Sequence, residues 1–177
     1  MSRPGLHAAR ARLARLTELA AETCACDRLR RAARATSRLY EAALAPVGLT
    51  ATQFAILIAA RRAGPIPLSR LAEVLVLDRT SLYRAVRPLA RRGCLAVVAG
   101  RTRRERLARL TAAGQRLLDR ALPRWEETQA RVRGAFGPRA WKDLAGALAA
   151  VVPAIRTLES GVAAAQPRTR SRRLASP

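Results

Sequence analysis

The sequence has few of the residues from which catalytic and metal sites are built. Its 177 residues include a single histidine, His7, and three cysteines, Cys24, Cys26 and Cys94. One distant histidine and three cysteines without paired ligand spacing do not form a zinc site. The chain also lacks a glycine-rich phosphate loop and a nucleophile elbow. We therefore expect a protein that is not an enzyme and that holds no metal and no cofactor.

Long apolar runs and aromatic residues are also scarce. No run approaches the ~18 residues that span a bilayer, and no apolar segment with a small-residue cleavage site opens the chain. We therefore expect a cytoplasmic protein with no membrane partner, in which the thiols are reduced. Aromatic residues make up 3% of the chain, which counts against the stacking of single-stranded RNA bases on the protein.

The sequence also has few acidic residues. The chain has 34 Lys and Arg against 12 Asp and Glu, a formal net charge of +22. Lys142 is the only lysine, a substitution pattern typical of GC-biased genomes, but such a bias does not explain the shortage of acids. The charge balance predicts a polyanionic partner such as nucleic acid or an anionic membrane surface.

Apolar residues at helical spacing divide the chain into a central lobe and flanking helices. We expect a first long helix over about 26–46 and further helices over about 112–157, with breaks at Pro123 and after Gly137. The lobe between them covers about 50–111. A helix in this lobe should be capped by Thr50 or Thr52.

The two ends differ from the domain that we expect over residues 24–162. Residues 1–23 form a basic arm, for which an amphipathic helix and a mobile extension both fit the pattern. Residues 163–177 are polar and basic, a composition typical of a disordered tail.

The segment LDRTSLYRAVRPLARRG, Leu77 to Gly93, predicts a helix with a charged face and an apolar face. At about 100° per residue, the charged side carries Thr80, Arg84, Arg87 and Arg91, and the apolar side carries Leu82, Ala85, Val86 and Leu89. Asp78 is the expected N-cap, because its carboxylate can accept the free amide hydrogens of the first turn. Pro88 lacks an amide hydrogen and is expected to bend or end the helix.

The charged face contains no acid, since no carboxylate lies between Asp78 and Glu105. A solvated helix face normally carries both signs of charge, because like charges three or four residues apart repel each other. A DNA major groove admits one helix, and arginine side chains there can form hydrogen bonds with guanine and with phosphates. We expect the start of the helix to reach base edges, through Arg79, Thr80, Ser81, Tyr83 and Arg84. Arg87 and Arg91 are expected to contact phosphates.

The next segment, CLAVVAGRTRRERLARLT, predicts two short strands around a basic turn. Such a wing would place Arg101, Arg103 and Arg104 in the adjacent minor groove. Two helices, a reading helix and a wing predict a mainly α (α+β) fold, a winged helix-turn-helix with long N- and C-terminal dimerisation helices.

The residues from about Cys24 to Val152 resemble the MarR family of bacterial transcriptional regulators. The resemblance is carried by LYEAALAPVGLTATQFAIL (Leu39–Leu57), LSRLAEVLVLDRTSLYRAVRPLARRGCL (Leu68–Leu95) and RRERLARLTAAGQRLL (Arg103–Leu118). It implies a homodimer with interlocking terminal helices, a recognition helix at about 78–92 and a wing over about 97–109.

The sequence departs from the family pattern at three positions. The family often keeps an acid, which helps to hold the wing, where Thr102 stands. It often has a small residue or glycine at Val76, and a capping Ser or Thr at Pro67.

The resemblance also places Cys26 where the organic-hydroperoxide-sensing branch of the family keeps its reactive thiol, and Tyr40 at one of the associated tyrosines. Arg30 and Ala51 stand where other tyrosines would align, so the match is partial. The alternative is that Cys26 is a small buried apolar residue. A disulfide between Cys24 and Cys26 within one helix is not expected. Cys94 is expected to serve packing.

We therefore expect a homodimeric regulator that binds double-stranded DNA at a pseudo-palindromic operator, a repressor by family analogy. Release would come from a small aromatic or lipophilic effector or from an oxidant at Cys26. The alternative is a DNA-compacting protein without sequence preference.

Overall fold

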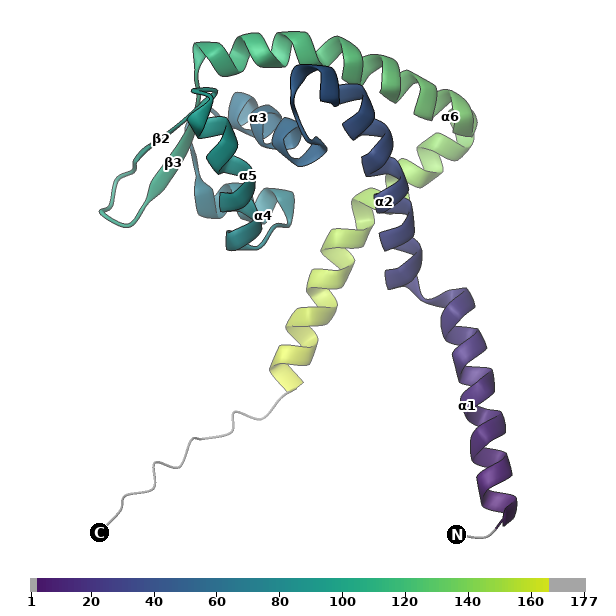
Figure 1. Ribbon diagram of the computed structural model, residues 1–177. Coiled ribbons are helices and arrows are strands. Elements are labelled where there is room, and N and C mark those ends of the chain that lie inside the picture. The colour runs from purple at the N-terminus through teal and green to yellow at the C-terminus, as the bar shows by residue number, and fades with distance from the viewer. Residues whose placement is uncertain (1–2, 166–177) are drawn as a thin grey trace, which may run out of the picture. The chain divides into compact units, whose positions relative to one another are not determined.

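The computed structural model describes residues 3–165 as helices with one small antiparallel sheet (Figure 1). The elements follow in the order α1 (Arg3–Thr23), α2 (Ala25–Leu44), η1 (Ala45–Val47), α3 (Ala51–Ala63), β1 (Ile66–Pro67), α4 (Leu68–Leu75), α5 (Arg79–Arg91), β2 (Leu95–Ala99), β3 (Arg106–Leu110) and α6 (Ala112–Ala165). The predicted winged helix fold is confirmed. Most of the predicted tail, from residue 166 on, lies outside the described residues.

The chain divides after Thr128 into two compact units. The first unit holds the hydrophobic core, to which every helix from α2 to α6 and each strand of the sheet contributes. The fully buried core side chains are Leu44, Ile56, Leu57, Leu71, Leu82, Leu89, Leu117 and Leu118. Ile56, Leu57, Leu71, Leu82 and Leu89 lie within the predicted lobe, whereas Leu44, Leu117 and Leu118 come from the flanking helices.

The sheet has the strand order β1-β3-β2, with both pairs antiparallel. The β2–β3 hairpin pairs Leu95 with Leu110 and Ala99 with Arg106. It forms the predicted wing beside α4 and α5 (Figure 1).

Thr50, and not Thr52, caps α3. The Thr50 side chain accepts a hydrogen bond from the Gln53 amide, at 3.2 Å, and the Gln53 side chain accepts one from the Thr50 amide, at 3.1 Å. This reciprocal capping box satisfies two amides that the helix itself leaves without partners.

The expected break at Pro123 is wrong, and Pro88, expected to bend or end its helix, does not end it. α5 continues past Pro88 to Arg91, and α6 is helical through Pro123. In both cases the neighbouring turns are buried in the core, at Leu89 and at Ala121, and this packing outweighs one lost backbone hydrogen bond. Gly137 is the non-helical residue inside α6, at φ 72° and ψ 164°.

The N-terminal arm is helical as α1, and its leucines from Leu13 onward lie in solvent. Leu13, Leu16 and Leu19 are exposed, so α1 buries none of them in this single chain. Within residues 3–165, no single helix is long and apolar enough to cross a membrane. One pair bent by 74°, Ala9–Val47 and Ala51–Ala63, passes that test on length and composition.

The second unit, from Gln129, is a helical segment on each side of Gly137. It leaves large apolar side chains exposed, namely Phe136, Leu148, Val152, Ile155 and Leu158. The last four recur at intervals of four, three and three residues, which places them on one helix face.

Candidate nucleic-acid interface

The recognition helix α5 begins at a side-chain cap. Asp78 Oδ1 accepts the Ser81 amide hydrogen at 2.9 Å, and Oδ2 accepts the Ser81 hydroxyl at 2.6 Å. The hydroxyl bond, followed by the backbone bond, holds the pKa of the exposed Asp78 carboxyl below its usual value. Ser81, predicted to read bases, therefore donates its hydroxyl hydrogen to the cap.

The two faces of α5 separate as the spacing predicts. Leu82, Val86 and Leu89 are at most 3% exposed, so this side of the helix belongs to the core. The opposite side is exposed and carries Arg79, Thr80, Tyr83, Arg84, Arg87 and Arg91. Because the apolar side is anchored, the arginines are presented on a rigid element.

The arginines of this face are not neutralised by acids. Two exposed ion pairs, Arg31 with Asp27 at 3.8 Å and Arg70 with Glu73 at 2.9 Å, occur elsewhere in the described part of the chain. Neither pair involves α5 or the wing. Arg79 instead lies 5.6 Å from the centre of the Tyr83 ring, a cation–π geometry.

Arg92, one residue beyond α5, has a different role from the other arginines. Its guanidinium donates to the backbone carbonyls of Gly48, at 2.5 Å, and Val47, at 3.3 Å. These two carbonyls lie at the end of η1. Arg92 thus joins the end of the recognition helix to the turn that follows α2, a contact between distant residues that the sequence analysis missed.

The wing turn exposes Arg101, Arg103 and Arg104 and is held by Glu105. The Glu105 carboxylate accepts the Arg101 amide hydrogen at 2.7 Å. The Glu105 backbone carbonyl accepts the Gly100 amide hydrogen at 3.0 Å, and the Glu105 amide donates to the Thr102 carbonyl at 3.1 Å. A side chain at Gly100 would overlap the Glu105 carboxylate. A larger residue at position 100 would therefore require the Glu105 side chain to move away from the turn.

An open apolar groove of about 870 Å³ lies between α2, α3, α4 and α6 in the first unit. It is lined by Tyr40, Leu44, Phe54, Ile58, Val74 and Trp125, among others, and Arg62 is its one charged lining residue. The Phe54 and Trp125 rings stack at 6.1 Å between centres. Burial raises the pKa of Tyr40 above its usual value. The size and lining are typical of a small-molecule site.

Comparison with known proteins identifies the family. The sequence profile of the MarR family matches residues 49–99. The crystal structure of the transcriptional regulator MosR from Mycobacterium tuberculosis is 34% identical in sequence, covers 76% of this chain and 96% of its own, and superposes with a TM-score of 0.68. This chain belongs to the MarR family. A search among curated proteins finds no match.

Two further structures relate this MarR-family chain to other regulators. MosR in complex with DNA is 38% identical, with 76% of this chain and 99% of its own covered and a TM-score of 0.65. BpsR from Bordetella bronchiseptica, whose DNA binding is regulated by 6-hydroxynicotinic acid, is 25% identical, with 77% and 93% covered and a TM-score of 0.59. The chain is thus a MarR-family transcriptional regulator.

The structure accounts for one departure from the MarR pattern, at Thr102, and shows the local geometry at the other two. Glu105 takes the role expected of an acid at Thr102, because it closes the wing turn from the other side. Val76 occupies the turn between α4 and α5 in the left-handed conformation, at φ 52°, a strained state for a β-branched residue. Pro67 precedes α4 without a side-chain cap.

The predicted redox site is only partly assembled in one chain. Cys24 and Cys26 are exposed, whereas Cys94 is buried as its packing role predicts. Cys26 and Tyr40 are fourteen residues apart on α2, about 21 Å along the helix, so they do not meet within one chain. The alternative of a buried Cys26 would require a partner subunit. No cluster of three His, Cys, Asp or Glu suited to a metal occurs among residues 3–165.

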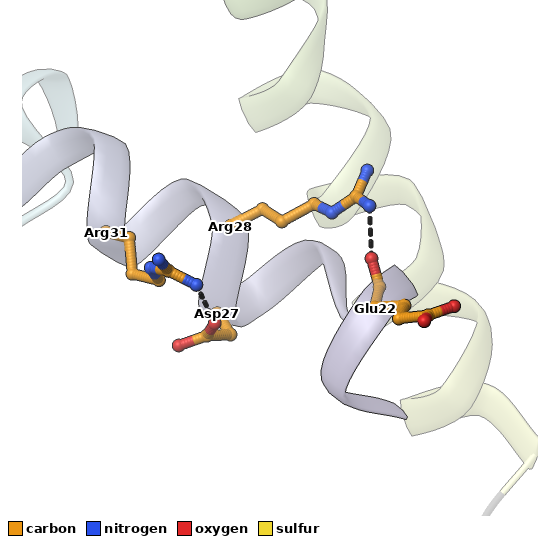
Figure 2. Close-up of polar contacts among 4 residues, drawn as sticks. All are labelled: Glu22, Asp27, Arg28 and Arg31. Atoms are coloured by element: carbon orange, nitrogen blue, oxygen red, sulfur yellow. Dashed lines mark hydrogen bonds and ion pairs between the residues drawn. The ribbon is translucent and has the colours of Figure 1, made fainter. Parts of the chain in front are cut away.

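Figure 2 shows polar contacts of Glu22, Asp27, Arg28 and Arg31, near the break between α1 and α2. Arg28 donates to the backbone carbonyl of Glu22 across the break between α1 and α2, and Arg31 pairs with Asp27. Cys24 lies in this break with extended backbone, and α2 starts at Ala25. The premise that both cysteines lie on one helix is therefore wrong, and the argument against a disulfide between them no longer applies.

Proposed function

We propose that this MarR-family regulator is a repressor that binds a pseudo-palindromic operator as a homodimer. In each subunit α5 enters the major groove and the wing enters the adjacent minor groove. The observation that carries the proposal is the α5 face whose arginines are exposed and free of ion pairs while its opposite face is buried. The regulator domain would be residues 24–162, with the DNA-binding lobe at 50–111.

The side chains proposed to contact DNA divide into three groups. Arg79, Thr80 and Arg84 lie near the start of α5, where side chains of a groove-bound helix reach base edges. Arg87 and Arg91 lie further along and suit phosphates. Arg101, Arg103 and Arg104 would line the minor groove, where arginine responds to groove width. The complex of the related MosR with DNA supports duplex DNA as the partner.

The homodimer is supported by the apolar face of the second unit. Leu148, Val152, Ile155 and Leu158 are 36–65% exposed along one side of α6, and no other element of this unit within residues 129–165 covers them. A second copy of this face would bury all four in a two-fold interface. Two recognition helices would then read half-sites about one helical turn apart.

Release is proposed to come from a small aromatic or lipophilic effector in the apolar groove. The groove touches α2 and α4, so an occupant contacts both a dimerisation helix and the helix-turn-helix. The regulation of the related BpsR by an aromatic acid supports this type of effector. An oxidant at the exposed Cys26 is the second proposed signal, because an accessible thiol is open to oxidation.

Selection of bound fragments from the parent genome, with peroxide or reductant present, tests the proposal. We expect a recurrent near-palindrome that is recovered from reduced protein. Cys26→Ser should keep that site in peroxide if Cys26 is the sensor, and Cys94→Ser is the matched control, since Cys94 is buried.

Titration of the selected operator against a scrambled duplex at fixed salt decides between regulation and compaction. A specific regulator should prefer its operator by ~10³ or more. A ratio below about tenfold would favour DNA compaction without sequence preference and would overturn the proposal.

A further inference from the structure

A second cavity, of about 380 Å³, lies between α4, α5 and the wing. We call it the notch. Its floor is formed by Leu68, Ala72 and Leu82, which carry no polar side-chain atoms. Its polar rim is formed by Ser69, Arg79, Tyr83, Arg104, Glu105 and Arg106.

Three arginines from three segments line the notch. Arg79 comes from the start of α5, Arg104 from the wing turn and Arg106 from β3. The only carboxylate on the rim is Glu105, which already accepts the Arg101 amide hydrogen at 2.7 Å. Arg106 makes only long hydrogen bonds, at 3.4 Å and 3.3 Å, to the carbonyls of Arg103 and Glu105. The rim therefore has an excess of positive charge and of hydrogen-bond donors.

The start of α4 adds donors to the same rim. The N-cap residue Pro67 makes no side-chain cap, so the amides of the first turn lack a side-chain acceptor. Ser69, the second residue of α4, carries an exposed hydroxyl on the notch. An anion with several oxygens matches this set of donors from separate elements.

We propose that the notch binds one phosphate of the DNA backbone, and that Ser69 and Arg106 are contact residues for it. The inference rests on the proposed function. A helix in the major groove and a wing in the next minor groove lie on opposite sides of one sugar–phosphate strand. That strand must pass between α5 and the wing, where the notch opens. Arg79 is thereby reassigned from base edges to the backbone.

Tyr83 is a positioning residue in this arrangement. Its ring lies 5.6 Å from the Arg79 guanidinium carbon and lines the notch beside it. The ring would hold the guanidinium toward the notch and restrict its rotamers before DNA binds.

The first test is the salt dependence of DNA binding by the full chain. Arg106→Ala should lower the slope of log K against log salt by about 1, on operator and scrambled duplex alike. Arg116→Ala, an exposed arginine of α6 outside the notch, is the matched control and should change the slope by less. Equal slopes for both variants would contradict phosphate binding in the notch. If wild-type protein does not prefer the operator over the scrambled duplex, the proposed function is wrong instead.

The second test neutralises operator phosphates one at a time with methylphosphonate. Wild-type protein should lose affinity at one position per half-site, and Ser69→Ala and Arg106→Ala should both be insensitive to that same substitution. Tyr83→Phe should retain the wild-type sensitivity, and Tyr83→Leu should lose part of it. If the notch variants keep full sensitivity at every phosphate, the assignment is wrong.

Discussion

Asp78 and Ser81 form two hydrogen bonds at the first turn of α5, at 2.9 Å and 2.6 Å. Since these bonds lower the pKa of Asp78 in the folded state, the stabilisation is present above the ordinary pKa, near 4. It is lost as the pH falls through the lower, folded pKa. The urea midpoint of wild type should therefore fall more steeply than that of Asp78→Asn below about pH 4. Parallel pH profiles would show that the carboxylate contributes nothing to stability.

Arg84 and Arg91 should differ in how they affect DNA binding. Arg84→Ala is expected to cost about 1–3 kcal/mol on the operator and to relax base preference. Arg91→Ala should weaken operator and scrambled duplex alike, because a phosphate contact carries no sequence information. Titration of each variant on both duplexes provides the measurement. Equal losses on both duplexes for both variants would show that the roles are misassigned.

Val76 should be replaceable by glycine without loss of stability. The left-handed conformation costs a residue with a Cβ atom roughly 1–2 kcal/mol, and Val76 is 60% exposed, so little burial is lost. Val76→Gly should be neutral or raise the free energy of unfolding by up to about 1 kcal/mol. Val74→Gly, at an exposed helical position of α4, should lower it. Similar destabilisation of both variants in urea unfolding would argue against strain at Val76.

Ile155 should be essential for dimer formation. Ile155→Glu places a charge in the middle of the exposed apolar face of α6, and burying an unpaired charge is costly. Sedimentation equilibrium should show a monomer for this variant. Thr157→Glu introduces the same charge on the opposite side of the helix and should remain dimeric. A dimeric Ile155→Glu variant would exclude this face as the interface.

Trp125 should report on the apolar groove. Trp141→Phe leaves Trp125 as the only tryptophan, and we expect 1-anilinonaphthalene-8-sulfonate, an aromatic and lipophilic probe, to quench its emission. Trp125→Phe keeps Trp141, which does not line the groove, so its emission should change less. An equal response of the two variants would place the probe elsewhere.

Local patterns predicted most of the lobe. The spacing of Leu82, Val86 and Leu89 identified the buried face of α5, and Asp78 identified its start, because both depend only on residues within four positions. The continuation of α5 past Pro88 and of α6 through Pro123 is not predictable from local sequence, because the packing that stabilises each helix there involves distant residues.

The candidate site was predicted less completely than the fold. Exposed arginines follow from charge pattern, but the pairing of Arg92 with carbonyls forty-four and forty-five residues away has no local signal. The closure of the wing turn by Glu105 is not predicted, because the family pattern places the acid that holds the wing at position 102. Cys24 was assigned to a helix that starts only after it.

The link between Arg92 and the carbonyls of Val47 and Gly48 has a mechanical consequence. The guanidinium ties the C-terminal end of α5 to the η1 turn that follows α2. The same two segments also meet in the core through Leu44, Leu49 and Leu89, so a displacement of the turn would be opposed both by packing and by this polar strut.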